Sequence, residues 1–306
     1  MIAKTVGVWI FMLLLGCASA PTPMEDMYNK MRLLEDSSKD RKPAEVATME
    51  AEISNLAEKN RESLLEALKN GSVNRRASAA AALGYIKDRE IVAPLVDALA
   101  DTDNIVRINA ALSLGMLGFE DTPIELLKIL LDDGDASVRS AATYAFIYIL
   151  REGKDSGLYE RLLQLLNDGS IDVRAHVILA LGTIGRKDAM QVIADKGTTD
   201  KSPLVRSNAA IVLGSFKDKS ANPYLIEMLR DDDHRVVYSA SVSLIKINGE
   251  DHGRSYSKWR DWWEDLEKRR KADEKAKELE AKQSANKTDS KLQPAPIEGK
   301  PKSSDK

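Results

Sequence analysis

The sequence predicts an all-α protein, an α-solenoid of about six helix–turn–helix repeats followed by a C-terminal tryptophan-rich capping helix. Three observations indicate this fold. Motifs such as "DTDNIVRINAALSLG" (residues 101–115) and "DKSPLVRSNAAIVLG" (residues 200–214) recur every 31 to 35 residues. Hydrophobic residues make up 43% of the chain and aromatic residues only 5%, which favours helices packed through alanine and leucine. Within each copy, the apolar residues follow the spacing of a helix.

The first twenty residues, "MIAKTVGVWIFMLLLGCASA", predict an export signal. Lys4 precedes an apolar run that is too short to span a membrane comfortably. The tetrapeptide "LLGC" at the end of this run resembles the lipobox of bacterial lipoproteins. The resemblance implies a signal peptide over residues 1–16 and lipidation of Cys17, the one cysteine of the chain. The alternative is an ordinary signal peptide cleaved after residues 18–20.

The lipobox resemblance also implies a location. A lipid on Cys17 holds the chain at a membrane of the cell envelope, on the extracytoplasmic side. Ala18 follows the cysteine, and by the rule known for enteric bacteria this residue favours the outer membrane where the organism has one. Residues 17–42 contain Pro, Ser, Asp and Lys, so we expect a linker between the lipid and the folded part.

A helical pattern begins at Pro43, and residues 43–248 are expected to form the solenoid. The copies align on an arginine that is replaced in the last copy: Arg76, Arg107, Arg139, Arg174, Arg206 and Val237. Serine or aspartate stands four residues earlier, where its oxygen can cap a helix start. Leucine stands eight residues earlier in every copy except one, which has Thr198. Each repeat is therefore predicted as a helix, a tight turn and a second helix, whose apolar faces become buried when neighbouring repeats stack.

An acidic residue in the turn accompanies nearly every arginine, six residues before it. The pairs in this spacing are Asp101 and Arg107, Asp133 and Arg139, Asp168 and Arg174, and Asp200 and Arg206. This spacing and the "VRxxAAxxLG" core resemble HEAT repeats, in particular the HEAT-like subtype first known in phycobilisome lyases, over about residues 58–248. The resemblance implies that these side chains form a structural ladder between successive turns and bind no ligand. Glycines such as Gly84 and Gly115 are assigned to close helix packing.

The second helix of each repeat is expected to line the concave side of such a solenoid. Positions two, five and nine after the arginine lie on one face of that helix. They carry tyrosine, asparagine, histidine and apolar residues without a dominant charge, which favours a protein or peptide partner. The predicted contact residues are Tyr85, Asn109, Tyr144, Tyr148, His176 and Asn208. In the alternative interpretation, the residues five positions after the arginine form a middle column that is buried between repeats. The residues two and nine positions after it are solvated.

The sequence shows no motif for catalysis. The three histidines lack the adjacent glutamates of the metal motifs in HEAT-like deoxyhypusine hydroxylases, and no glycine-rich phosphate loop or GxSxG motif occurs. We therefore expect no enzymatic activity, no metal and no cofactor. The net charge of −3 argues against a nucleic-acid partner. The predicted function is a lipid-anchored scaffold for a protein or peptide. The alternatives are a lyase or tetrapyrrole-handling enzyme, which export to the envelope disfavours, and a structural envelope spacer.

The C-terminal part has a different composition. Residues 249–283 contain Trp259, Trp262 and Trp263, whose spacing places them on one face of a helix. We expect this aromatic face to cap the last repeat, with a partner-docking face as the alternative. A charged, solvated helix follows to about residue 283. Residues 284–306 lack the apolar content needed to fold and are predicted to form a disordered tail.

Overall fold

The computed structural model describes residues 27, 30–31, 43–150 and 157–291. Within these ranges the regular structure is helical and contains no strand, so the all-α prediction is confirmed. The signal peptide over residues 1–16 and the lipidation site Cys17 lie outside the described residues, as do most of the linker and residues 292–306. The chain divides into two compact units, Met1–Asp251 and His252–Lys306.

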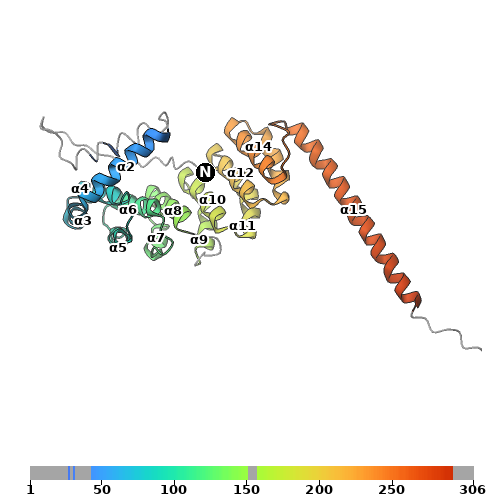
Figure 1. The fold of residues 1–306 in the computed structure, drawn as a ribbon, viewed down its shortest axis with the longest axis horizontal. Coiled ribbons are helices and arrows are strands. Elements are labelled where there is room, and N and C mark those ends of the chain that lie inside the picture. The colour runs from blue at the N-terminus through green and yellow to red at the C-terminus, as the bar shows by residue number, and fades with distance from the viewer. Residues whose placement is uncertain (1–26, 28–29, 32–42, 151–156, 292–306) are drawn as a thin grey trace, which may run out of the picture. The chain divides into compact units, whose positions relative to one another are not determined.

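The first unit is a stack of helix pairs (Figure 1). The first helices of the pairs are α3 (Arg61–Asn70), α5 (Val92–Ala98), α7 (Glu125–Leu130), α9 (Leu158–Leu165), α11 (Lys187–Val192) and α13 (Asn222–Glu227). The second helices are α4 (Val73–Leu83), α6 (Asn104–Leu117), α8 (Ala136–Ile149), α10 (Ile171–Ile184), α12 (Pro203–Phe216) and α14 (His234–Asn248). Short 3-10 turns flank α5 and α13, at Arg89–Ile91, Lys219–Ala221 and Met228–Arg230.

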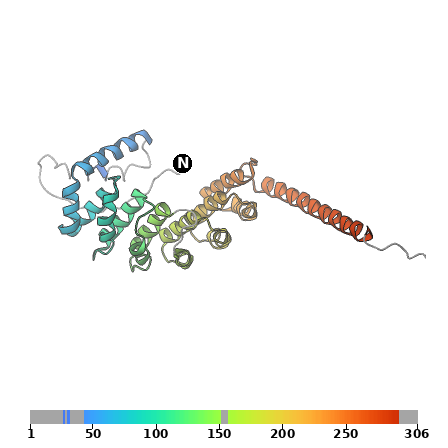
Figure 2. The same ribbon diagram turned by 60° about the horizontal axis from the view of Figure 1, so that its bottom comes forward.

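The pairs stack in chain order, as Figure 2 shows from a second direction. Successive second helices from α4 to α14 pack on one another, and each packs on the first helix of its own pair, except α12, which packs on the π-helical turn Ile193–Gly197 after α11. The second helices thus form one row and the first helices another, which we call the second-helix row and the first-helix row. The predicted solenoid is therefore confirmed.

Side chains in the turns set where the second helices begin. The carboxylates of Asp103 and Asp135 accept the backbone N–H groups of Ile105 and Ser137 at 3.0 and 2.7 Å. These bonds satisfy amides that have no partner within the helix. Several second helices end in a glycine with left-handed backbone, for example Gly185 with φ of 70°. The predicted helix–turn–helix unit follows from these local signals.

Small residues let the second helices approach closely. A Cβ on Gly84 would lie 2.6 Å from Oγ of Ser113, and a Cβ on Gly214 would lie 2.6 Å from Cβ of Ser243. The same serines donate hydrogen bonds across the row, Ser113 to the carbonyl of Ala80 at 2.8 Å. The glycines are therefore required for packing and bring hydroxyl groups within reach of the neighbouring backbone.

Arginine–aspartate pairs link the turns of successive repeats. Within the described residues, each arginine binds the aspartate of the following repeat: Arg76 with Asp101, Arg107 with Asp133, Arg139 with Asp168, Arg174 with Asp200, and Arg206 with Asp231. Each arginine also donates to a carbonyl of its own turn, as Arg139 does to Asp133 at 2.8 Å. The aspartate in turn accepts an N–H of its own turn. This arrangement forms a continuous polar ladder along the stack.

Helix α2 (Pro43–Lys59) packs on α4 at the start of the stack. Oγ of Ser54 donates to the carbonyl of Tyr85 at 2.9 Å. Upstream of α2, Met27 and Met31 are buried, and Lys30 forms an ion pair with Glu52 at 2.7 Å. Part of the region expected to be a linker is therefore folded onto α2.

The second unit is dominated by helix α15 (Tyr256–Lys291). Trp259 is fully buried, and its Nε1 donates to the carbonyl of Gly253 at 2.9 Å. The rings of His252 and Trp262 contact Trp259 edge-on, with centroids 4.7 and 5.4 Å away. Trp263 is half-buried. A capping role for the tryptophans stays a prediction.

From residue 268 to residue 282 α15 is exposed, and it carries ion pairs between successive turns, for example between Arg270 and Glu267 at 2.9 Å. The helix ends at Lys291, beyond the expected end near residue 283. Among the described residues, no helix combines the length and the apolar composition that crossing a bilayer requires.

Candidate functional site

The second-helix row carries a group of aromatic side chains, which we call the aromatic cluster: Tyr85, Tyr144, Tyr148 and His176. Tyr85 follows α4, Tyr144 and Tyr148 lie one turn apart on α8, and His176 lies on α10. The ring centroid of Tyr144 is 4.9 Å from that of Tyr148 and 5.7 Å from that of His176. Rings from the third and fourth repeats therefore meet in one place, and Tyr85 of the first repeat lies near enough to contribute to the raised pKa of Tyr144.

The packing of α6 against α8 explains this position. A Cβ on Gly115 would lie 3.2 Å from the Tyr144 ring and 3.0 Å from Cα of Ala145. Glycine thus leaves the room in which the Tyr144 ring lies. Tyr148 stands nine residues after Arg139, as Tyr85 does after Arg76, so the repeat places both at the same level of the row.

The cluster is uncharged at neutral pH. Burial raises the pKa of Tyr144 far above its usual range, and the nearby hydroxyl of Tyr148 raises it further. Burial also lowers the pKa of His176, whose Nδ1 lies 3.0 Å from Oγ of Ser140. Tyr144 is only 6% exposed, whereas Tyr85, Tyr148 and His176 are half-buried. Neutral rings with hydroxyl and imidazole edges suit aromatic or apolar contacts combined with single hydrogen bonds.

The two asparagines predicted as contacts join neighbouring repeats. Nδ2 of Asn109 donates to the carbonyl of Ala77 at 3.0 Å, and Nδ2 of Asn208 donates to that of Ala175 at 3.2 Å. Asn109 is 1% exposed and therefore lies out of a partner's reach, while Asn208 is half-buried. Their column, two residues after the arginine, thus contributes mainly to the contacts between repeats.

The residues five positions after the aligned arginine, the middle column, differ in their exposure along the stack. Leu112 and Tyr144 are buried, whereas Ile211 and Val242 are 41% and 45% exposed. Tyr238, one turn before Val242 on α14, is 54% exposed. The sequence pattern alone does not indicate this change, because residues in one column have the same helical position in every repeat.

Metal-ligating side chains do not gather in the described part of the chain. Across residues 27, 30–31, 43–150 and 157–291, no three side chains of His, Cys, Asp or Glu come together in a way that could hold a metal ion. The expected absence of a metal and of a cofactor stays a prediction.

Comparisons with known proteins give relatives of low identity. Deoxyhypusine hydroxylase-B from Oryza sativa subsp. japonica is 26% identical, with 64% of this chain and 84% of the relative covered. A designed armadillo repeat protein in complex with the peptide (KR)4 is 19% identical, with a TM-score of 0.47 and 61% of this chain and 98% of that chain covered. The complex of CpcE and CpcF of phycocyanin lyase from Nostoc is 17% identical, with a TM-score of 0.43 and coverage of 83% and 99%.

The rice relative contradicts the expectation that this chain is not an enzyme, since that relative is named as a hydroxylase. The expectation depended on a search for catalytic motifs, and such a search is weak for repeat proteins. A repeat scaffold hosts both binding and catalytic functions, and the residues for either lie outside the repeat pattern.

A comparison with sequence profiles of protein families identifies the repeats. A sequence profile described as HEAT repeats matches residues 61–147 and 159–246, which together make up more than half of the chain. The matched ranges begin within the first helices α3 and α9 and end within the second helices α8 and α14, so they coincide with the stacked pairs and the arginine–aspartate ladder. The chain therefore belongs to the HEAT-repeat family.

Proposed function

We propose that this chain is a scaffold that binds a protein or peptide partner on its second-helix row, with the aromatic cluster as the central contact. The observation that carries the proposal is the convergence of the half-buried Tyr148 and His176 on the Tyr144 ring. The half-buried Tyr85 of the first repeat lies near enough to contribute to the raised pKa of Tyr144. Tyrosine rings give a large contact area for little loss of side-chain entropy. The stacked repeats beneath them hold the rings in place before a partner arrives, which lowers the entropic cost of binding.

The chemistry of the cluster restricts the partner. A charged side chain would lose hydration at the cluster without gaining an opposite charge there. An aromatic or aliphatic side chain, next to a backbone N–H or carbonyl, would gain ring contacts and a hydrogen bond to a tyrosine hydroxyl or to the His176 ring. The proposed partner segment is therefore apolar and uncharged where it meets the cluster.

The proposal includes lipidation at Cys17 and an extracytoplasmic location, with the outer membrane favoured. Its support is the lipobox resemblance of the sequence around that residue. Replacement of Cys17 by alanine should release the protein from the membrane fraction of its native cells. Mass spectrometry of the N-terminal peptide should show the lipid on the wild-type chain. A membrane-bound Cys17→Ala protein, or an unlipidated wild-type peptide, would remove this part of the proposal.

Crosslinking in native cells tests the binding role. We expect a partner that is captured by the wild-type chain and lost from a Tyr85→Ala, Tyr148→Ala double variant with an unchanged circular dichroism spectrum. The matched control is Tyr238→Ala, which removes an exposed tyrosine of the same row outside the cluster. This variant should keep the partner. Equal capture by all three proteins would show that the cluster is not the contact.

A second candidate function is catalytic, and the rice relative favours it. In this case the chain would hydroxylate a deoxyhypusine side chain of a bound protein. The test incubates the purified chain with a deoxyhypusine-containing protein, dioxygen, divalent metals and a chemical reductant, which supplies the two electrons that reduce the second oxygen atom to water. The rice enzyme is the positive control. A gain of one oxygen atom in the substrate, measured by mass spectrometry, would support this candidate, and an unchanged substrate mass beside an active control would remove it.

A further inference from the structure

The fifth repeat departs from the others at the end of its first helix. At the position eight residues before the aligned arginine, the other repeats have a leucine that is at most 7% exposed: Leu68, Leu99, Leu131, Leu166 and Leu229. The fifth repeat has the half-buried Thr198 instead. A π-helical turn, Ile193–Gly197, directly precedes it. Such turns are rare and often mark functional sites.

The π-helical turn brings the backbone close to the second-helix row. A Cβ on Gly197 would lie 2.8 Å from Cβ of Ala209 and 2.9 Å from Cδ1 of Ile178. Only glycine fits here without displacing these side chains. Because the backbone lies against α10 and α12, and because threonine is shorter than leucine, space remains on the other side, next to α13.

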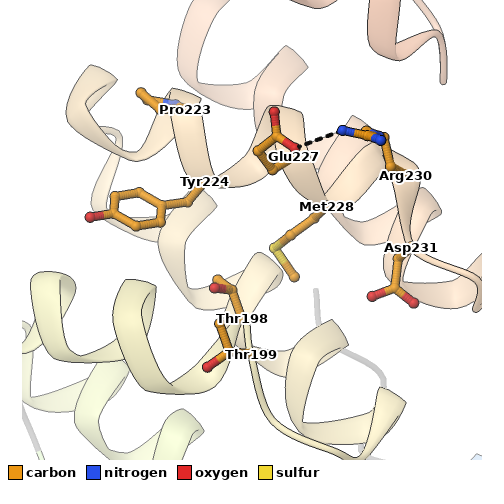
Figure 3. Close-up of a pocket in the computed structure, with 8 residues that line it drawn as sticks. All are labelled: Thr198, Thr199, Pro223, Tyr224, Glu227, Met228, Arg230 and Asp231. Atoms are coloured by element: carbon orange, nitrogen blue, oxygen red, sulfur yellow. Dashed lines mark hydrogen bonds and ion pairs between the residues drawn. The ribbon is translucent and has the colours of Figure 1, made fainter.

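This space forms a pocket of about 490 Å³ between the fifth and sixth repeats (Figure 3). Its lining comes from the two residues after the π-helical turn and from α13 with the turn after it: Thr198, Thr199, Pro223, Tyr224, Glu227, Met228, Arg230 and Asp231. The Met228 side chain points toward Thr198, with the Tyr224 ring to one side (Figure 3). The volume is in the range of small-ligand sites.

The wall of the pocket is held in place by bonds between repeats. The Tyr224 hydroxyl donates to Oδ1 of Asp195 at 3.2 Å and accepts from Nε2 of Gln191 at 2.7 Å. The ring is thus fixed with its carbon skeleton along the pocket. Together with the thioether of Met228 it provides an apolar surface.

The polar atoms of the pocket are mainly acceptors. The hydroxyls of Thr198 and Thr199 donate their protons to the carbonyls of Ala194 and Asp195, at 2.5 and 2.8 Å. Each oxygen therefore keeps lone pairs with which it can accept a hydrogen bond. The carboxylates are those of Glu227 and Asp231, and the cation of the lining is Arg230, which lies 3.5 Å from Glu227.

Asp231 is already engaged as a ladder residue. Arg206 donates to both of its oxygens, at 2.6 and 2.8 Å, and this bond lowers the pKa of Asp231. The carboxylate therefore stays ionised, its charge is balanced by Arg206, and it offers no free pair of oxygens. A guanidinium, which binds best to two oxygens of one group, finds no free pair of oxygens on Asp231.

We propose that this pocket binds the lysine side chain of a protein partner. The alkyl stem lies along Met228 and Tyr224, and the ammonium group donates to the threonine oxygens and to Glu227. An ammonium has three donors and no acceptor, which matches the acceptors of the pocket. A lysine stem gains from apolar contact, and its charge gains from the face of a tyrosine ring. The pocket lies on the first-helix row, so this proposal is independent of the aromatic cluster.

Nuclear magnetic resonance of the full chain, labelled at methionine and threonine methyl groups, tests the proposal. The probe is n-butylammonium chloride, which reproduces the end of a lysine side chain, and 1-pentanol is its neutral counterpart. We expect saturable shifts of the Met228, Thr198 and Thr199 methyl signals with n-butylammonium in the millimolar range, and much smaller shifts with 1-pentanol. Equal responses to both probes, or no saturable response to n-butylammonium, would overturn the proposal.

Two variants connect the response to the pocket. Thr198→Leu restores the residue type of the other repeats, so it should fill the pocket and abolish the shifts. Glu227→Gln removes an exposed carboxylate without a change in size and should also weaken binding strongly. The matched control is Glu125→Gln on α7, where Glu125 pairs with Lys128 in the same spacing outside the pocket. Since Glu227 is exposed, its variant is expected to fold even if Thr198→Leu does not. Unchanged binding by Glu227→Gln would refute the proposed role of its charge.

Discussion

Removal of one rung of the arginine–aspartate ladder should destabilise the whole first unit. The side chains of Arg139 and Asp168 are 17% and 7% exposed, and Nε and Nη2 of the arginine donate to the two carboxylate oxygens at 2.8 and 2.9 Å. Arg139→Met leaves the Asp168 carboxylate ionised, with a hydrogen bond from the N–H of Ser170. It also removes the hydrogen bond that Arg139 donates to the carbonyl of Asp133.

The expected cost is large because the pair is shielded from water. Loss of one partner of a buried ion pair costs about 3 to 5 kcal/mol, since the remaining charge stays desolvated. The ladder borders the turns and is not fully buried, so we expect a loss of about 3 kcal/mol in the free energy of unfolding. Because repeat arrays are stabilised by nearest-neighbour contacts, this weak interface in the middle of the stack should also lower cooperativity.

Urea unfolding followed by circular dichroism measures both effects. The matched control is Arg235→Ala, which removes an arginine that pairs with Asp233 at 2.7 Å but is 60% exposed. Exposed pairs are screened by solvent, so the control should lose little stability. A loss for Arg139→Met no greater than that for Arg235→Ala would refute the argument that the ladder stabilises the stack.

Other substitutions and conditions give further predictions. Gly214→Ala places a Cβ 2.6 Å from Cβ of Ser243 and should lower the free energy of unfolding by about 1 to 3 kcal/mol. Gly134→Ala, whose added Cβ would have no atom within 4 Å, should leave the free energy of unfolding unchanged. Thermal unfolding of both variants checks this prediction. The pKa of His176 is lowered in the folded state, so the unfolded chain binds the proton first, and stability should fall as the pH drops below about 6.5. A His176→Gln variant should lose that part of the pH dependence in urea titrations, and an unchanged dependence would contradict the assignment. The hydrogen bond from Arg76 lowers the pKa of Asp101, so its stabilisation should be present above about pH 3.9 and lost at lower pH as the folded carboxylate protonates, and an Asp101→Asn variant should be less acid-sensitive in the same titrations.

The sequence by itself determined the helical repeats and the residues that share a helix face. Its period, the capping residues such as Asp103 and the arginine spacing are local features, and local features can be read without coordinates. The HEAT-like character followed from the same columns. The absence of known catalytic motifs was a weaker guide, because a fold of this kind is shared by binding proteins and enzymes.

The tertiary structure alone decided which residues of neighbouring repeats bond to each other and which become buried. Arg107 bonds to the carbonyl of Asp101 but forms its ion pair with Asp133, because stacking brings the next turn, and not its own, to the end of the guanidinium. Asn109 is buried and Ile211 is exposed although both lie on the same predicted face. The pocket beside Thr198 arises from a local π-helical turn against the next repeat. A repeating sequence specifies the position of a residue within its helix, whereas burial depends on the distance and angle between successive helices, which only packing sets.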